Sequence, residues 1–174
     1  LTKENKDYLA NLPYSIRRDK FLFVHGSPNS QHEYLLPDMD AFAALERVEN
    51  ARAEILFCGH THQPYIRELA DGSIAVKIKN SAPKNIQEKE IQLPMRRIVN
   101  AGSVGEPRHG GTKATYVVHN EVTNEVKIRE VEYDIELTCK AIIDAGLPPI
   151  FAWRLKNGFE FAEQAEDASH VCER

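Results

Sequence analysis

The sequence lacks a long hydrophobic run, a cysteine pattern and a large excess of charge of either sign. No apolar stretch in its 174 residues approaches the roughly 18 that a membrane-spanning helix needs, and residues 1–6 lack the apolar core of a signal peptide. Its three cysteines are odd in number and far apart, so neither a disulfide framework nor a zinc knuckle is indicated. The net charge of −4 predicts no general attraction to nucleic acid or to an anionic membrane. We therefore expect a soluble, cytoplasmic protein.

The remaining composition is that of an ordinary globular protein, with 42% hydrophobic and 28% charged residues. Its length suits one domain or a large part of one. Residue 1 is Leu and not Met. Maturation, removal of a tag, or a chain that begins partway through its gene would each explain that, and composition does not decide among them.

Two short apolar runs, residues 21–24 and 55–58, are predicted to be strands buried on both faces, because their bulky residues do not alternate with polar ones. A helix is predicted between them over residues 39–51, with Asp38 as its N-cap. A further helix is expected over residues 2–12, ended by Pro13. The order strand, loop, helix, strand predicts an α/β fold.

The rest of the chain reads as hairpins followed by helices. Residues 65–69 and 74–78 flank Asp-Gly, a turn signal, and are predicted to pair as a hairpin. The remaining predictions are, in order, a loop at 80–94, a strand at 98–99, a second hairpin of 115–118 with 126–131, helices at 134–145 and 151–156, and a frayed acidic tail at 159–174. Residues 1–158 are expected to form one folded unit.

Three strand ends carry polar groups beside a glycine. His25 precedes Gly26, His60 and His62 follow Gly59, and Asn100 ends an apolar run. Ligands in α/β proteins bind outside the carboxyl ends of the strands, so we expect these groups at one rim. Imidazoles bind Zn, Mn and Fe, and two histidines in an extended H-x-H segment point the same way.

Each of these residues also has a structural reading. His25 alone suits a hydrogen-bonded histidine that caps a strand, and Arg108 suits a solvated loop arginine paired with Glu106. Cys58 lies in an apolar run and is expected to be a buried core residue. His32 and His109 lie in polar loops that could face the site. None of the carboxylates considered as a bridge between two metals follows a buried strand (Asp38, Asp40 and Asp71).

Taken in order, these segments resemble the calcineurin-like metallophosphoesterases. Residues 59–62 fit G-H-x-H, residues 23–26 fit the upstream strand with its lone His-Gly, and residues 100–108 are similar to N-x-G-S-x-x-x-P-R. The last is typical of a small bacterial branch of phosphodiesterases and diadenosine-tetraphosphatase-like enzymes. The similarity runs from about residue 20 to about residue 158.

The resemblance implies a four-layer αββα sandwich with two mixed β-sheets. It implies a hydrolase of phosphomonoesters or phosphodiesters that uses two divalent metal ions (Mn, Fe or Zn). His25 and His60 would bind one metal and His62 the other, while His60 and Arg108 would act on the phosphate. The supports that orient the histidine loop would be Asn100, Gly102 and Ser103. A phosphate-ester substrate is implied, with nucleotides and phosphoproteins both open, and the oligomeric state is not predicted.

The motifs D-x-H, G-D-x-x-D and G-N-H that supply the other ligands of this family do not occur in the sequence. We expect them to precede Leu1, so that this chain is the C-terminal half of the domain. With only three of the site's ligands, the isolated chain is expected to bind metal weakly and to catalyse poorly. Two rival functions stay open. One is a non-catalytic binding scaffold of the same fold, and the other is an unrelated H-x-H metallohydrolase of esters or amides.

Overall fold

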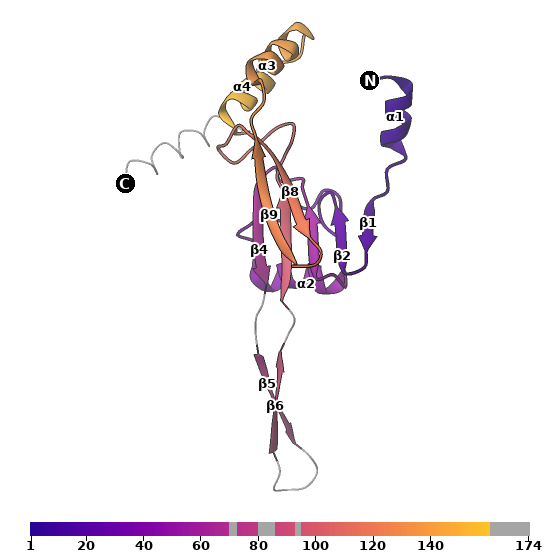
Figure 1. The fold of residues 1–174 in the computed structure, drawn as a ribbon, viewed down its shortest axis with the longest axis vertical. Helices are drawn as coiled ribbons and strands as arrows, with labels where there is room; N and C mark the ends of the chain where they lie inside the picture. The colour runs from indigo at the N-terminus through magenta and orange to yellow at the C-terminus, as the bar shows by residue number, and fades with distance from the viewer. Residues whose placement is uncertain (70–72, 80–85, 93–94, 161–174) are drawn as a thin grey trace, which may run out of the picture.

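A mixed five-stranded sheet forms the body of the protein (Figure 1). The computed structural model describes residues 1–69, 73–79, 86–92 and 95–160. In spatial order the sheet contains β1 (Ser15–Arg18), β2 (Phe21–Val24), β3 (Ile55–Cys58), β7 (Arg96–Ala101) and β4 (Pro64–Leu69). The central strands β2, β3 and β7 are parallel, and the edge strands β1 and β4 run antiparallel to their neighbours. The predicted α/β class is confirmed.

The predicted strands of residues 21–24 and 55–58 lie where the apolar runs placed them, and they pair in parallel. Every residue of β3 is buried, as its unbroken hydrophobic run predicts. In β2 the prediction of burial on both faces is wrong for Phe23, which is 38% exposed, although Phe21 and Leu22 are buried. Phe23 stacks on Phe57 with 4.7 Å between ring centroids, so its contact is with the neighbouring strand.

The predicted hairpin of residues 65–69 with 74–78 is wrong. Strand β4 pairs with β7, and β5 (Ser73–Lys79) pairs instead with β6 (Ile86–Gln92). Pairing with β7 buries Leu69 in the core, a long-range gain that a local turn signal does not report. The loop predicted over 80–94 therefore contains a strand, and its other residues and the Asp-Gly turn lie outside the described residues. Figure 1 shows the β5–β6 ribbon projecting from the main sheet.

Helix starts follow side-chain capping. Thr2 caps α1 (Lys3–Ala10), and Asp134 caps α3 (Ile135–Asp144). Helix α2 (Ala41–Asn50) is capped by Asp40, whose carboxylate accepts a hydrogen bond from the Ala43 backbone. The predicted cap Asp38 is therefore wrong, because the chain enters helical geometry two residues later. Helix α4 (Pro149–Asn157) packs against α3, and none of the described helices is long and apolar enough to cross a membrane.

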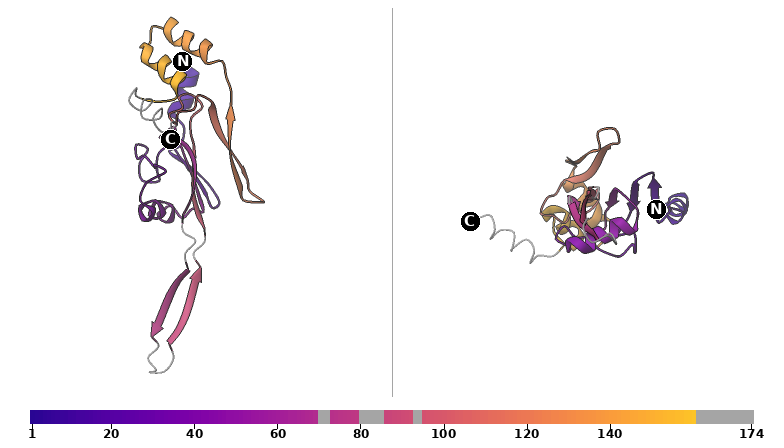
Figure 2. Two further views of the ribbon diagram at one scale, coloured as in Figure 1. Left: turned by 90° about the vertical axis from the view of Figure 1, so that its left-hand side faces the viewer. Right: turned by 90° about the horizontal axis from the view of Figure 1, so that it is seen from below.

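Two hydrophobic clusters lie on opposite faces of the main sheet. Helix α2 covers one face, where Ala44 and Val48 pack on Leu56 and Ile98. The hairpin of β8 (Ala114–Asn120) and β9 (Glu125–Val131), predicted as such, covers the other. Figure 2 shows α2 and this hairpin on either side of the sheet. The hairpin is antiparallel, so the second mixed sheet of the four-layer sandwich remains a prediction. The tail predicted to fray lies outside the described residues beyond 160.

Candidate metal centre

The predicted functional groups gather at the carboxyl ends of the three parallel strands. His25 follows β2, Gly59 and His60 follow β3, and Asn100 lies near the end of β7, directly opposite Cys58 in the register. The Gly59 backbone N–H donates to the His25 carbonyl over 2.9 Å, which ties the first two strand ends together. The strand-end rule therefore placed these residues correctly.

His25 and His60 form a close pair. The His60 Nδ1 atom lies 3.0 Å from the His25 Nε2 atom, and the ring centroids are 4.7 Å apart. If both nitrogens bound one ion through bonds of about 2.1 Å, this separation would correspond to an angle of about 90°, as in octahedral coordination. The pair therefore has a geometry that suits a shared metal ion.

The backbone at His60 and His62 is left-handed, with φ of 60° and 58°. The expectation that the H-x-H segment is extended is therefore wrong. A tight turn replaces it, in which the Thr61 N–H contacts the Gly59 carbonyl over 2.6 Å. Left-handed backbone is unfavourable for non-glycine residues, so this turn persists because surrounding contacts hold it.

Asn100 provides those contacts. Its side chain is fully buried, and its Nδ2 donates to the Gly59 carbonyl at 2.7 Å and to Thr61 Oγ1 at 2.9 Å. Its Oδ1 accepts a hydrogen bond from the Gly102 N–H at 2.9 Å. The Ser103 hydroxyl accepts a hydrogen bond from the Glu106 backbone N–H, also at 2.9 Å. All three residues predicted as supports thus contact the histidine turn or the loop beside it.

His62 has a defined tautomer. Its Nδ1 lies 2.6 Å from the Glu106 carbonyl oxygen, which can only accept, so Nδ1 carries the proton and Nε2 keeps its lone pair. Metal-binding histidines commonly donate their second ring N–H to a backbone carbonyl in this way. The backbone N–H of Arg108 also donates a hydrogen bond to the His62 carbonyl at 3.2 Å. His62 is therefore oriented as a nitrogen ligand by a contact separate from the His25–His60 pair.

Arg108 is held by acidic groups. Its guanidinium lies 3.0 Å from the Glu160 carboxylate and 3.6 Å from that of Glu106, and the side chain is 17% exposed. Pairing with Glu106, the structural reading of the sequence, is thus present. Arg108 also lines a pocket with five other residues, namely Tyr34, Leu36, Thr61, Gln63 and Glu160. Its contact with phosphate remains a prediction.

Two residues of the 26–37 loop surround His60. Tyr34 stacks on the imidazole with 4.3 Å between centroids and 11° between planes, and the His32 ring lies 6.4 Å away. Burial lowers the pKa of His60, and the nearby His25 lowers it further. Sequence reasoning considered His32 and missed Tyr34, because an aromatic residue in a polar loop gives no signal of what it packs against. His109, the other loop histidine considered, lies against Gly111. Cys58 is buried as predicted, and burial raises the pKa of its thiol to about 12.

The donor set suits divalent metals in part. The imidazoles of His25, His60 and His62 supply the nitrogen ligands that Zn, Mn and Fe accept, and the Glu106 carbonyl orients that of His62. However, the side chains of the described segments contain no group of three or more His, Cys, Asp or Glu placed to hold an ion. Further ligands, carboxylates above all, are needed to complete a two-metal site.

Comparison with known proteins identifies the family. The model of the calcineurin-like phosphoesterase superfamily domain matches residues 2–124. The chain belongs to this superfamily. An uncharacterized protein of Methanocaldococcus jannaschii is 30% identical over 163 residues, which is 89% of this chain and 60% of that protein. A UDP-2,3-diacylglucosamine hydrolase of Shewanella halifaxensis is 38% identical over 66 residues, 36% of this chain and 28% of the enzyme.

Solved structures agree with this membership. A metallophosphoesterase from Sphaerobacter thermophilus superposes with a TM-score of 0.69 and 26% identity, covering 91% of this chain and 64% of that one. A hypothetical protein from Pyrococcus horikoshii shares the fold, with a TM-score of 0.68, 22% identity, and coverage of 91% and 56%. The chain thus spans less than two thirds of the length of these relatives.

Proposed function

We propose that the chain supplies part of the active site of a metal-dependent phosphoesterase that hydrolyses phosphomonoesters or phosphodiesters with two divalent ions. The observation that carries the proposal is the His25–His60 pair at the ends of two adjacent parallel strands, 3.0 Å between ring nitrogens. Its support is membership of a phosphoesterase superfamily. The ions would be Mn, Fe or Zn, since nitrogen and oxygen donors accept each of these.

Each residue has a role in this proposal. His25 and His60 hold one ion, and His62 holds the other through its free Nε2. When bound, such ions polarise phosphoryl oxygens and lower the pKa of water. Arg108 contributes positive charge toward the phosphate, with Glu106 and Glu160 fixing its guanidinium. Asn100 keeps the histidine turn in its left-handed conformation.

The rival function is a binding scaffold without catalysis. It is favoured by the lack of a group of three metal-binding side chains in the described segments. The retained histidine pair favours the enzyme, because a scaffold gains nothing from two imidazoles in contact at an exposed strand end.

Hydrolysis assays separate these functions. The assay uses a protein that joins this chain to the further carboxylate ligands that a two-metal site needs. After chelator treatment and readdition of Mn²⁺ or Zn²⁺, we expect that protein to turn over bis(p-nitrophenyl) phosphate or p-nitrophenyl phosphate, and to turn over p-nitrophenyl acetate no faster. His60→Gln and His62→Gln should each lower kcat/KM at least about 100-fold, because each removes a ligand of the metal that stabilises the transition state. His119→Gln removes an imidazole that contacts Asn124, Phe21 and Phe57 and is not a proposed ligand, so it is the control once its thermal transition shows that it is folded.

The assay has three contrary outcomes. Metal binding without turnover of either phosphate ester would support the scaffold. Preference for the acetate would support a carboxyl-ester hydrolase. Full activity after chelation, or in His60→Gln, would contradict metal dependence through this histidine.

A further inference from the structure

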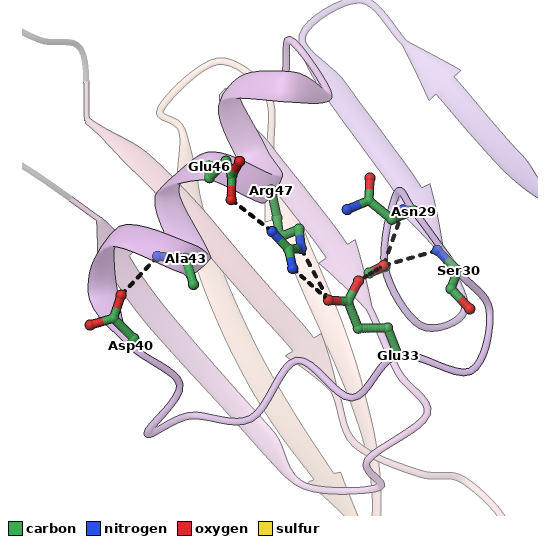
Figure 3. A network of polar contacts seen from close by, with 8 residues as sticks. Asn29, Ser30, Glu33, Asp40, Ala43, Glu46 and Arg47 are labelled. Atoms are coloured by element: carbon green, nitrogen blue, oxygen red, sulfur yellow. Dashed lines mark hydrogen bonds and ion pairs between the residues drawn. The ribbon is translucent and has the colours of Figure 1, made fainter.

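The loop after His25 is closed by a buried serine. Ser27 is 5% exposed, and its Oγ accepts hydrogen bonds from the backbone N–H groups of Asn29 and Ser30, both at 3.1 Å (Figure 3). The same hydroxyl donates to the Glu33 carboxylate. The loop also packs tightly on itself, since a Cβ at Gly26 would lie 2.7 Å from the Ser30 carbonyl oxygen. The path of the chain just after His25 therefore depends on this hydroxyl.

Glu33 connects that loop to helix α2. Its Oε1 accepts a hydrogen bond from Arg47 Nε at 3.0 Å and forms an ion pair with a terminal nitrogen of Arg47, also at 3.0 Å. Arg47 uses its other terminal nitrogen to contact Glu46 over 2.9 Å. Only about a quarter of the Glu33 and Arg47 side chains is exposed, so solvent screens this pair less than a typical surface pair. Figure 3 shows the chain of contacts from the loop to the helix.

The neighbours of Glu33 face the histidine pair. Tyr34 stacks on the His60 ring, and the His32 ring lies near it. Glu33 lies between these two residues in the sequence, so the contacts of its carboxylate restrain the backbone that carries both rings. The Glu33 side chain thus anchors both the loop that follows His25 and the segment that places His32 and Tyr34 beside His60.

We propose that Glu33 is a positioning residue of the His25–His60 site, acting through Ser27 on one side and through Arg47 on the other. It touches neither histidine. It holds the two imidazoles in contact before any ion arrives, so that the metal meets a formed pair and not two mobile side chains. The consequence for metal affinity rests on the proposed function, but the positioning of the pair does not.

The test compares Glu33→Gln and Ser27→Ala with the matched control Glu46→Gln. Glu33→Gln removes the carboxylate charge that contacts both Ser27 and Arg47. Ser27→Ala removes the hydroxyl contact with Glu33 and the two hydrogen bonds that the hydroxyl accepts within the loop, and it keeps the Glu33–Arg47 pair. Glu46→Gln removes an equal charge that contacts the same arginine but not the loop. Each variant is first shown to be folded by its thermal transition.

Two readouts follow, the first without metal. Nuclear Overhauser contacts between the His25 and His60 rings should be present in the wild type and in Glu46→Gln and lost or weakened in the other two variants. Titration with Co²⁺ alone, followed by its d–d absorption, should show the dissociation constant raised about 10- to 100-fold in Glu33→Gln and Ser27→Ala, with an altered spectrum. The loss in the double variant should be smaller than the sum of the two single losses, because each single variant already breaks the Ser27–Glu33 contact.

The outcomes distinguish the two proposals. Unchanged ring contacts in both folded Glu33→Gln and Ser27→Ala would overturn the role of Glu33, whatever the protein hydrolyses. An equal loss of ring contacts in Glu46→Gln would overturn it as well, by showing a general effect of charge near α2. If wild type shows the ring contact and binds no Co²⁺, the proposed metal dependence fails, while the first readout still decides on Glu33.

Discussion

At the scale of single residues, the histidine turn depends on backbone conformations that few side chains adopt. His60 and His62 are left-handed, and so is Gly102, with φ of 73°, in the loop that Asn100 links to them. Thr115 of β8 joins the same network, because its hydroxyl accepts from the Ser103 N–H and donates to the Ala101 carbonyl. The left-handed turn is thus fixed by buried polar groups from β7 and β8.

A glycine series tests how tightly this network is packed. Gly102→Ala combines left-handed strain with overlap, since the new Cβ would collide with the Thr115 hydroxyl and lie 3.0 Å from the Pro64 side chain. We expect a loss of about 3 kcal/mol in the free energy of unfolding, measured by urea denaturation.

Two other glycines serve as controls for that change. Gly146 has φ of 71° and nothing within 4 Å of a new Cβ, so Gly146→Ala should cost only the strain, about 1 kcal/mol. Gly105 has neither constraint, and Gly105→Ala should not destabilise the fold. Equal losses at Gly102 and Gly146 would show that Thr115 does not confine this loop.

At the scale of elements, the link between the 25–34 loop and α2 is electrostatic and therefore sensitive to pH. The pKa of Glu33 is lowered, chiefly because Ser27 donates a hydrogen bond to its carboxylate and further through the hydrogen bond and charge of Arg47, while burial opposes the shift. Arg47 keeps its charge throughout, and Glu46 is the other charged group that contacts it.

The sign of the pH dependence follows from that lowered pKa. The ionised Glu33 stabilises the fold above the unfolded-state pKa of about 4.5, and this contribution is lost as pH falls through the lower folded-state pKa. The stability of wild type minus that of Glu33→Gln should therefore be largest near pH 6–7 and shrink below pH 4.5 in urea titrations. Glu46→Gln is the control, and a gap that stays constant down to pH 3 would refute the link.

At the scale of the whole molecule, the main sheet is stabilised by different elements on its two faces. Adjacent residues of β7 belong to different clusters: Ile98 packs under α2, and Val99 packs with Phe57 under the β8–β9 hairpin. Both clusters must form for the strand ends to line up, because β7 contributes to each and also carries Asn100. The site is therefore coupled to global packing.

Truncation of Val99 tests this dependence. Val99 is fully buried, so Val99→Ala should lower the free energy of unfolding by about 2 kcal/mol through lost burial and the cavity left behind. Val122→Ala makes the same change at a side chain that is 95% exposed and should stay within about 0.5 kcal/mol of wild type. Similar effects in both variants, measured by thermal and urea unfolding, would contradict the assigned core.

Local sequence patterns predicted the central strands, the residues at their ends and the β8–β9 hairpin, because each of these depends on residues close together in the sequence. The apolar runs at β2 and β3 predicted buried strands, and the polar groups at the strand ends predicted that His25, His60 and Asn100 gather at one rim. The structure shows that these strands are parallel. The β8–β9 hairpin was also read correctly, since its second strand alternates in polarity. Strand β1 was missed, because its four residues are all exposed and have no apolar pattern.

By itself, the sequence determined the superfamily motifs, the central strands and the identity of the candidate ligands, since strand periodicity and short motifs depend on residues close along the chain. Only the tertiary structure decided that β4 pairs with β7, that the H-x-H turn is left-handed, and that Glu33 links the His25 loop to α2. Each of these depends on groups far apart in the sequence, because a strand's partner and a buried side chain's hydrogen bonds are selected by the packing of the whole fold.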